Sequence, residues 1–361
     1  MKRTGPVPFA KLAASVLLVL VAACGPQAAA PSGALVPGAS ARSQAAWILA
    51  DVRPPAVTAD AFRALTAGHG LVAGDRTAWT RTDDGGWVPA DPVTNETRNG
   101  ITGWGDGLVA WADGSVITTS RDGVRWADAS HGPAEGTPSR VVAIGDRLLL
   151  LGDATKERLG AWVSDDGDAW TALTDAPQGL AGAAPLMTGG LVAVGTRDTT
   201  GTVWVKGGGG SWSSLAAPRG TDGEPLSLHD VAVGGPAIVT VGYAGERPAG
   251  WVSSDTPAAW RQSLDLREPD SWLSDVEHGD LGFVIAGRSA GRPALWLSTD
   301  GEAWTFVGLP LPPGDEGTGT ASRVVTTDEG IVVFGYATAD AGNGGDSATA
   351  YLVWTLEPGG R

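Results

Sequence analysis

Residues 161–170, with the sequence AWVSDDGDAW, decide the fold of this chain. The segment opens on an apolar stretch around Trp162, continues through Ser164-Asp165-Asp166-Gly167 and closes on Trp170. Two aromatic, alternating stretches joined by an Asp-Gly sequence are typical of antiparallel strands connected by a tight turn. The segment therefore predicts a β-hairpin.

The same hairpin recurs along the chain. The nearest copy is LWLSTDGEAW at residues 295–304, and looser copies end at Trp87, Trp126, Trp212 and Trp260. The intervals between the closing tryptophans range from 39 to 48 residues, which is the length of one four-stranded propeller blade. Apolar runs that fit a second strand occur seven times, at 71–73, 108–110, 148–151, 191–194, 237–241, 283–286 and 331–334. The sequence therefore predicts an all-β, seven-bladed β-propeller over residues 46–357.

The two ends of the repeat predict how the ring closes. The seventh unit stops after the strand around Trp354, whereas residues 46–51 match the fourth strand around Trp170. We expect this N-terminal strand to complete the last blade, because closure removes an exposed sheet edge. Tight turns between first and second strands are predicted at Gly105-Asp106, Gly145-Asp146, Gly234-Gly235 and Gly279-Asp280. Thirteen of the 16 tryptophans fall at two repeating positions, where we expect them to pack between sheets.

The N-terminus has the features of an export signal. Residues 1–23 carry three basic residues ahead of an apolar run, which ends in the sequence VAACG at 21–25. This ending resembles the lipobox of bacterial lipoproteins, in which the peptide is cut before the cysteine and the cysteine is acylated. The resemblance implies a signal peptide over 1–23, a lipidated Cys24 with a flexible spacer over 24–45, and attachment outside the bacterial cell membrane. An ordinary secretory signal with a chance cysteine is the alternative.

Composition excludes several classes of function. The 361 residues include 25 Lys and Arg against 40 Asp and Glu, for a formal charge of −15. Loss of residues 1–23 would leave 22 basic residues and a charge of −18, which argues against nucleic-acid binding. The single cysteine excludes a disulfide scaffold, and the four histidines show no zinc-ligand spacing. The sequence therefore predicts no cofactor and no metal site.

The Ser-x-Asp-Gly-x-x-Trp pattern of residues 164–170 resembles the Asp-box of the BNR-repeat propellers, a superfamily that includes the sialidases. The resemblance spans residues 46–356 and implies a folding element in which the aspartate binds the backbone N–H groups of its own turn. Sialidases resemble one another in an Arg-Ile-Pro segment, a three-arginine clamp and a Tyr–Glu nucleophile pair. No Arg-Ile-Pro occurs in this chain.

The loops opposite the Asp-Gly turns are the expected ligand-binding face. Alignment of the first strands at their predicted turns places four basic side chains on one rim: Arg63, Arg140, His229 and Arg323. Tyr243, Tyr336 and Trp272 are predicted beside them. Because arginine binds carboxylate or phosphate in two places, the rim predicts a clamp for an acidic sugar or a peptide carboxylate. The alternative is that each arginine pairs with an acidic loop residue.

Two functions are consistent with these residues. The first is a lipid-anchored, non-catalytic binding or scaffold module for a protein or an envelope glycan. The second is a sialidase-like exo-glycoside hydrolase, which needs a nucleophile and an acid/base carboxylate close together. Contact of Tyr243 or Tyr336 with a glutamate would favour the hydrolase, whereas pairing of the rim arginines with carboxylates would weaken it. A spacer role within a larger envelope complex is a third possibility.

Overall fold

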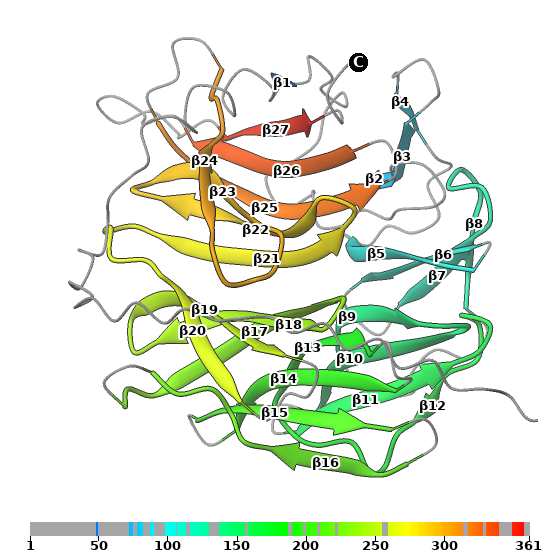
Figure 1. Cartoon of the computed structure of the whole chain (residues 1–361). Coiled ribbons are helices and arrows are strands. Elements are labelled where there is room, and N and C mark those ends of the chain that lie inside the picture. The colour runs from blue at the N-terminus through cyan, green and yellow to red at the C-terminus, as the bar shows by residue number, and fades with distance from the viewer. Residues whose placement is uncertain are drawn as a thin grey trace, which may run out of the picture. The chain divides into compact units, whose positions relative to one another are not determined.

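The computed structural model describes residues 98–356 apart from short gaps, together with residues 48–49, 72–74, 78–81 and 87–89. The gaps fall at residues 106, 113–115, 130–136, 156–157, 187–189, 198–199, 208–209, 221–222, 255–258, 313–316, 328–329 and 339–348. The regular structure of the described residues consists of β-strands, as predicted (Figure 1). No helix in this part of the chain is long and apolar enough to cross a membrane.

The strands form antiparallel sheets that succeed one another along the chain (Figure 1). One sheet contains β5 (Arg98–Trp104), β6 (Gly107–Ala112), β7 (Ile117–Ser120) and β8 (Trp126–Asp128). The next contains β9 (Thr137–Ile144), β10 (Arg147–Thr155), β11 (Arg158–Ser164) and β12 (Thr171–Ala172). It is followed by the sheet of β13 (Leu180–Pro185), β14 (Leu191–Arg197), β15 (Thr200–Lys206) and β16 (Trp212–Leu215).

Two further sheets repeat the same order, and a third departs from it. The first contains β17 (Leu226–Gly234), β18 (Ala237–Ala244), β19 (Arg247–Ser254) and β20 (Trp260–Asp265). The second contains β21 (Trp272–Gly279), β22 (Gly282–Ser289), β23 (Arg292–Ser298) and β24 (Thr305–Gly308). The C-terminal sheet contains β25 (Thr318–Thr327), β26 (Gly330–Thr338) and β27 (Thr349–Leu356), with β1 (Ile48–Leu49) as its fourth strand.

The prediction of a seven-bladed propeller closed by an N-terminal strand is wrong: the described residues form six four-stranded blades. Only six of the described sheets have four strands, and residues 72–89 form a three-stranded sheet of β2 (Val72–Gly74), β3 (Ala78–Arg81) and β4 (Trp87–Pro89). Instead of the predicted strand over 46–51, only the two residues of β1 are described as paired, with Thr355 and Trp354. The residues directly ahead of β2 lie outside the described residues, so no first strand is described for this sheet.

The first strand of each complete sheet is its inner strand, and consecutive inner strands pack against one another. β5 contacts β9, and the contacts continue through β13, β17 and β21 to β25. Sheets separated in sequence by about one repeat are therefore neighbours, as in Figure 1, where β21 lies between β17 and β25. This order brings side chains from several inner strands together.

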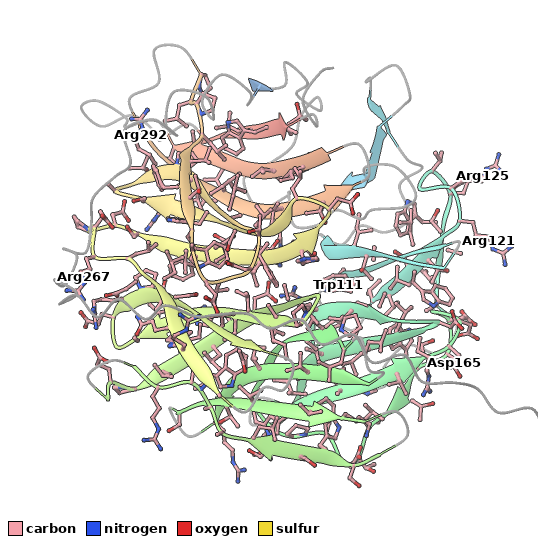
Figure 2. The ribbon with its side chains drawn as sticks, viewed as in Figure 1. Trp111, Arg121, Arg125, Asp165, Arg267 and Arg292 are labelled. Atoms are coloured by element: carbon pink, nitrogen blue, oxygen red, sulfur yellow. The ribbon has the colours of Figure 1, made fainter. Side chains whose placement is uncertain are left out.

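Tryptophans at the third-strand position fill the space between sheets, as predicted. Trp162, Trp204, Trp251, Trp296 and Trp354 are all buried among aliphatic side chains of their own and adjoining sheets. In Figure 2, Trp111 likewise lies among the strands, whereas the labelled charged residues Arg121, Arg125, Asp165, Arg267 and Arg292 lie at the outside. Burial of these large rings, together with the aliphatic side chains around them, stabilises the packing of the sheets.

The Ser-x-Asp-Gly turns have the predicted hydrogen bonds. In residues 120–126, Oδ1 of Asp122 accepts the backbone N–H groups of Val124 and Arg125 at 2.9 and 2.7 Å, and Ser120 Oγ accepts that of Gly123. The same bonds recur around Asp166 and Asp300. These backbone hydrogen bonds lower the pKa of all three aspartates, so the turn is held by a charged acceptor.

Candidate functional site

A β-bulge near the start of every described inner strand sets the geometry of the site. The bulged residues are Asn99, Ser139, Ala181, His229, Ser274 and Ser322. In five of the six sheets the second strand carries a glycine beside the bulge: Gly152, Gly195, Gly242, Gly287 and Gly335. A Cβ atom on Gly242 would lie 1.9 Å from the carbonyl oxygen of Ser227, so the close approach of the two strands requires glycine.

The residue after each bulge occupies an equivalent position in every inner strand. These residues are Gly100, Arg140, Gly182, Asp230, Asp275 and Arg323. The predicted rim paired Arg140 and Arg323 with His229, which the structure places one residue out of register. The cause is the turn: the two-residue loop after β17 is 235–236, not 234–235, and the loop after β21 is 280–281. A one-residue shift exchanges the two faces of a strand.

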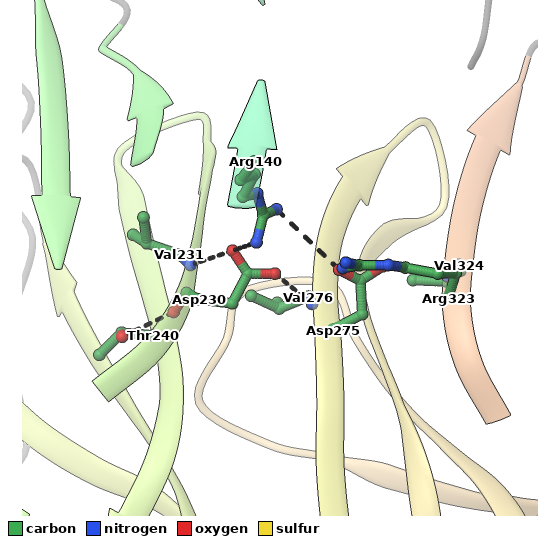
Figure 3. A network of polar contacts seen from close by, with 8 residues as sticks. All are labelled: Arg140, Asp230, Val231, Thr240, Asp275, Val276, Arg323 and Val324. Carbon is green, nitrogen blue, oxygen red and sulfur yellow. Dashed lines mark hydrogen bonds and ion pairs between the residues drawn. The ribbon is translucent and has the colours of Figure 1, made fainter. Parts of the chain in front are cut away.

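Four of these equivalent residues form a network of ion pairs, which with Glu277 we call the central cluster (Figure 3). Arg140 Nη1 lies 2.6 Å from Asp230 Oδ1, and Arg140 Nη2 lies 4.0 Å from Asp275 Oδ1. Arg323 Nη1 donates to Asp275 Oδ1 at 2.8 Å. The side chain of Asp230 is 1% exposed and that of Arg140 is 19% exposed. The two arginines are therefore already paired with buried carboxylates.

The two aspartates also join neighbouring sheets through the backbone. Asp230 on β17 accepts the N–H of Val276 on β21 at 3.2 Å, and Asp275 on β21 accepts the N–H of Val324 on β25 at 3.0 Å. Each aspartate thus accepts a hydrogen bond from the second residue after the bulge of the next inner strand (Figure 3). The central cluster therefore links successive blades and satisfies buried backbone donors.

The central cluster contains three carboxyl groups and two guanidinium groups, and burial and their mutual charges shift the pKa values of its members. Burial opposes the charge of Arg140, but the adjacent Asp230 and Asp275 outweigh it and raise its pKa. Burial raises the pKa of Asp230 to about 6, against the opposing effect of Arg140. Burial, together with the charges of Asp275 and Asp230, raises the pKa of Glu277 to about 8. Glu277 is therefore mostly protonated at neutral pH, which limits the negative charge of the cluster.

A second group of side chains lies where inner strands begin and second strands end. The rings of His229 and Tyr243 have centroids 5.2 Å apart, and those of Tyr243 and Trp272 are 5.4 Å apart, edge to face. His229 and Trp272 are 6.4 Å apart. Trp272 is 43% exposed, so one aromatic surface faces solvent. These three residues, which the sequence predicted to lie on one face of the propeller, come from β17, β18 and β21.

Hydroxyl groups border the aromatic rings. Ser227 Oγ lies 2.8 Å from His229 Nε2, and Thr196 Oγ1 donates to Ser227 Oγ at 3.3 Å. Burial lowers the pKa of His229, so its ring is neutral at pH 7. Burial raises the pKa of Tyr243 to about 12, despite the nearby positive charge of Arg288, so its hydroxyl stays protonated.

An ion pair borders Trp272 on its other side. Arg288 is the direct cross-strand partner of Trp272, and its Nη2 lies 2.5 Å from Asp270 Oδ1. The Nε of Arg288 is buried and has no hydrogen-bond partner among the described residues. We call His229, Tyr243, Trp272, Ser227, Asp270 and Arg288 the aromatic site. The sequence did not reveal Asp270 and Arg288 as a pair, because Asp270 lies in the loop before β21 whereas Arg288 lies near the end of β22.

Backbone strain flanks the aromatic site. Among the described non-glycine residues, only Asp270 and Ala290 have positive φ, at 52° and 48°. Gly291 N–H donates to the Asp270 carbonyl at 3.0 Å, which ties the loop before Trp272 to the turn after Arg288. Left-handed conformations of this kind are costly outside glycine and gather at functional sites. The loop is therefore held in one conformation around Trp272.

The remaining predicted residues do not join either group. Tyr336 is exposed on β26 and has no ring contact with the aromatic site in the described residues. Neither Tyr243 nor Tyr336 contacts a glutamate in the part of the chain that the structure describes. Arg63 and Cys24 lie outside the described residues, as do the predicted signal and spacer. No three His, Cys, Asp or Glu side chains among the described residues are arranged to hold a metal ion.

No protein family and no curated protein matches the sequence. Solved structures do match the fold. Streptogramin B lyase aligns with a TM-score of 0.62 at 9% identity, covering 87% of this chain and 99% of the lyase. The WD40 β-propeller domain of Doa1 aligns with a TM-score of 0.57 at 11% identity, covering 84% of this chain and 95% of that domain. The chain is a β-propeller.

A structure of YCF48 bound to D1 peptide is also similar to this propeller. Its TM-score is 0.58 at 16% identity, covering 86% of this chain and 97% of YCF48. At these identities the similarity establishes the fold alone. What this propeller binds must therefore be argued from its own side chains.

Proposed function

We propose that the protein is a non-catalytic binding propeller, held on the outer side of the bacterial cell membrane by acylated Cys24. The observation that carries the proposal is the aromatic site, where Trp272 is 43% exposed and its ring lies close to those of Tyr243 and His229. Exposed aromatic rings bordered by a few polar groups are typical of ligand sites on rigid scaffolds. The Asp-box-like turns and the lipobox-like sequence support a secreted BNR-type propeller.

The pairing of the arginines argues for binding rather than glycoside hydrolysis. Arg140 and Arg323 contact Asp230 and Asp275, so neither guanidinium is available to hold a substrate carboxylate without breaking an ion pair. The two candidate tyrosines have no described glutamate partner. The tyrosine–glutamate pair of a sialidase-like hydrolase is therefore not found among the described residues, and the carboxylates of the central cluster are buried and paired with arginines.

A protein partner is a second candidate for the same face. The observation in its favour is the similarity of the fold to YCF48, which was solved with a peptide. A protein partner would need a contact area of roughly 800 Å² on this propeller, and the aromatic site would be its central contact.

Arrays of envelope glycans and random peptides, probed with the full-length protein in detergent, test the proposal. We expect binding that is lost in Trp272→Ala and kept in Phe306→Ala, a matched control because Phe306 is equally exposed on the outer strand β24. Binding that survives Trp272→Ala would place the ligand elsewhere. Release of the protein from membranes on Cys24→Ser tests the anchor separately.

A further inference from the structure

We infer that the aromatic site binds the pyranose ring of a neutral sugar. This inference rests on the proposed binding function and names its ligand class. The four large apolar side chains that are exposed among the described residues are Trp272, Leu281, Phe306 and Tyr336. Only the first belongs to the aromatic site, because Leu281 lies in the turn at the other end of β21 and Phe306 on an outer strand. The apolar surface at the site is therefore about the size of one ring.

A single exposed indole suits a sugar better than a protein surface. The C–H groups on one face of a pyranose carry partial positive charge, and the face of an aromatic ring is negative, so the two stack. Protein interfaces instead bury several apolar anchors at their centre. Tyr243 packs edge to face against Trp272, and the ring centroid of His229 lies 6.4 Å from that of Trp272. Two other rings therefore pack near the indole.

The polar groups around Trp272 match the hydroxyl groups of a sugar. Asp270 is half exposed and accepts hydrogen bonds, and Arg288, its partner at 2.5 Å, donates them. An acid–base pair of this kind can bind two neighbouring hydroxyls, each of which both donates and accepts.

The charge of the site favours a neutral ligand over an acidic one. Arg288 is already paired with Asp270, and the neighbouring His229 is uncharged at neutral pH because burial lowers its pKa. A sugar carboxylate would therefore meet the negative charge of the half-exposed Asp270, while Arg288 is already paired. The whole chain carries a charge of −15, which acts in the same direction.

Saturation-transfer NMR of the full-length protein in detergent tests the inference. The probes are methyl β-glucoside, methyl β-galactoside, N-acetylglucosamine and glucuronic acid, with a pool of random hexapeptides as the alternative ligand. We expect transfer to ring protons of at least one neutral sugar, and an at least tenfold higher Kd in Trp272→Ala. Phe306→Ala should change the Kd less than twofold, and Trp272→Phe should keep part of the binding.

The outcomes separate the inference from the proposed function. Trp272-dependent binding of hexapeptides or glucuronic acid alone would overturn the neutral-sugar inference and leave the binding site in place. Sugar binding that is equal in the wild type and Trp272→Ala would overturn the assignment of this site. Binding of neither sugars nor peptides would overturn both.

Discussion

The central cluster and the aromatic site share the inner strands β17 and β21, yet they differ in how many of their polar groups have hydrogen-bond or ion-pair partners. In the central cluster every aspartate has an arginine and a backbone N–H as partners. In the aromatic site the largest ring is partly exposed, and the Nε of Arg288 has no hydrogen-bond partner in the part of the chain that the structure describes. Groups that satisfy one another stabilise a fold, whereas groups left partly unsatisfied are available to a ligand. The comparison assigns structure to the first region and binding to the second.

Removal of Asp230 should have the largest effect, and it should act on stability. Asp230→Ala leaves Arg140 without its 2.6 Å partner and the Val276 N–H without an acceptor. Breaking a buried ion pair on one side typically costs about 3–5 kcal/mol, and urea denaturation measures it. The control is Asp165→Ala, whose partner Arg147 is exposed, with an expected loss below about 1 kcal/mol. Equal losses in the two variants would contradict the structural role of the central cluster.

Removal of the Trp272 ring should act on binding and leave stability nearly unchanged. The exposed ring contributes little to the core, whereas it offers the largest apolar surface at the site. We expect an at least tenfold rise in Kd, equivalent to about 1.4 kcal/mol, with a change in unfolding free energy of about 0.5 kcal/mol or less. A large loss of stability would mean that Trp272 belongs to the core, and the comparison would fail.

The pH dependence of stability should report on Glu277. Its folded pKa of about 8 lies above its ordinary value, so the folded state binds a proton that the unfolded state releases between about pH 4.5 and 8. Stability from this group is thus complete at acid pH and lost as the pH rises through about 8. Asp230, with a pKa of about 6, acts in the same direction. Glu277→Gln should flatten the decline and stabilise the protein most at pH 8, as measured by thermal unfolding.

Glu302→Gln is the matched control for that experiment, because Glu302 is exposed and pairs with Arg261 on the outer strands. Its pH profile should follow that of the wild type. If Glu277→Gln also follows the wild type, then Glu277 does not hold a proton in the folded state.

The smallest expected effect comes from Ala290. Its φ of 48° is unfavourable for any residue with a Cβ atom, so Ala290→Gly should stabilise the fold by about 1 kcal/mol. Ser289→Gly, one residue earlier on β22, should destabilise it, because there glycine only adds freedom to the unfolded chain. Thermal unfolding measures both. If Ala290→Gly destabilises the protein, the turn beside the aromatic site is not strained.

The sequence predicted the strand order because the hairpin recurs with little change at intervals of 39 to 48 residues. It did not predict the central cluster, because two turns were placed one residue early and this exchanged His229 for Asp230. A signal for the correct register was present: the apolar run within each of five second strands is followed directly by a glycine, at Gly152, Gly195, Gly242, Gly287 and Gly335. Each glycine marks the bulge that turns the following inner-strand residue toward the cluster.

The aromatic site was predicted in part. His229, Tyr243 and Trp272 were named, but the sequence could not tell that Trp272 contacts the other two rings, because it comes from the next blade. The arginine clamp was predicted on the assumption that Arg140 and Arg323 have no acidic partners, whereas both form ion pairs. Asp230 and Asp275 reach Arg140 across sheets that are far apart in sequence, and no local pattern encodes such a contact.

An NMR titration of the full-length protein with the neutral methyl glycosides tests the central claim most directly. The indole N–H signal of Trp272, assigned with Trp272→Phe, and the guanidinium Nε–H signals of Arg140 and Arg323 are followed in one experiment. We predict that the Trp272 signal shifts in a saturable way while both arginine signals stay in place. Shifts of the arginine signals with an unmoved Trp272 would show that the central cluster binds the ligand, and would contradict the division of roles between the two regions.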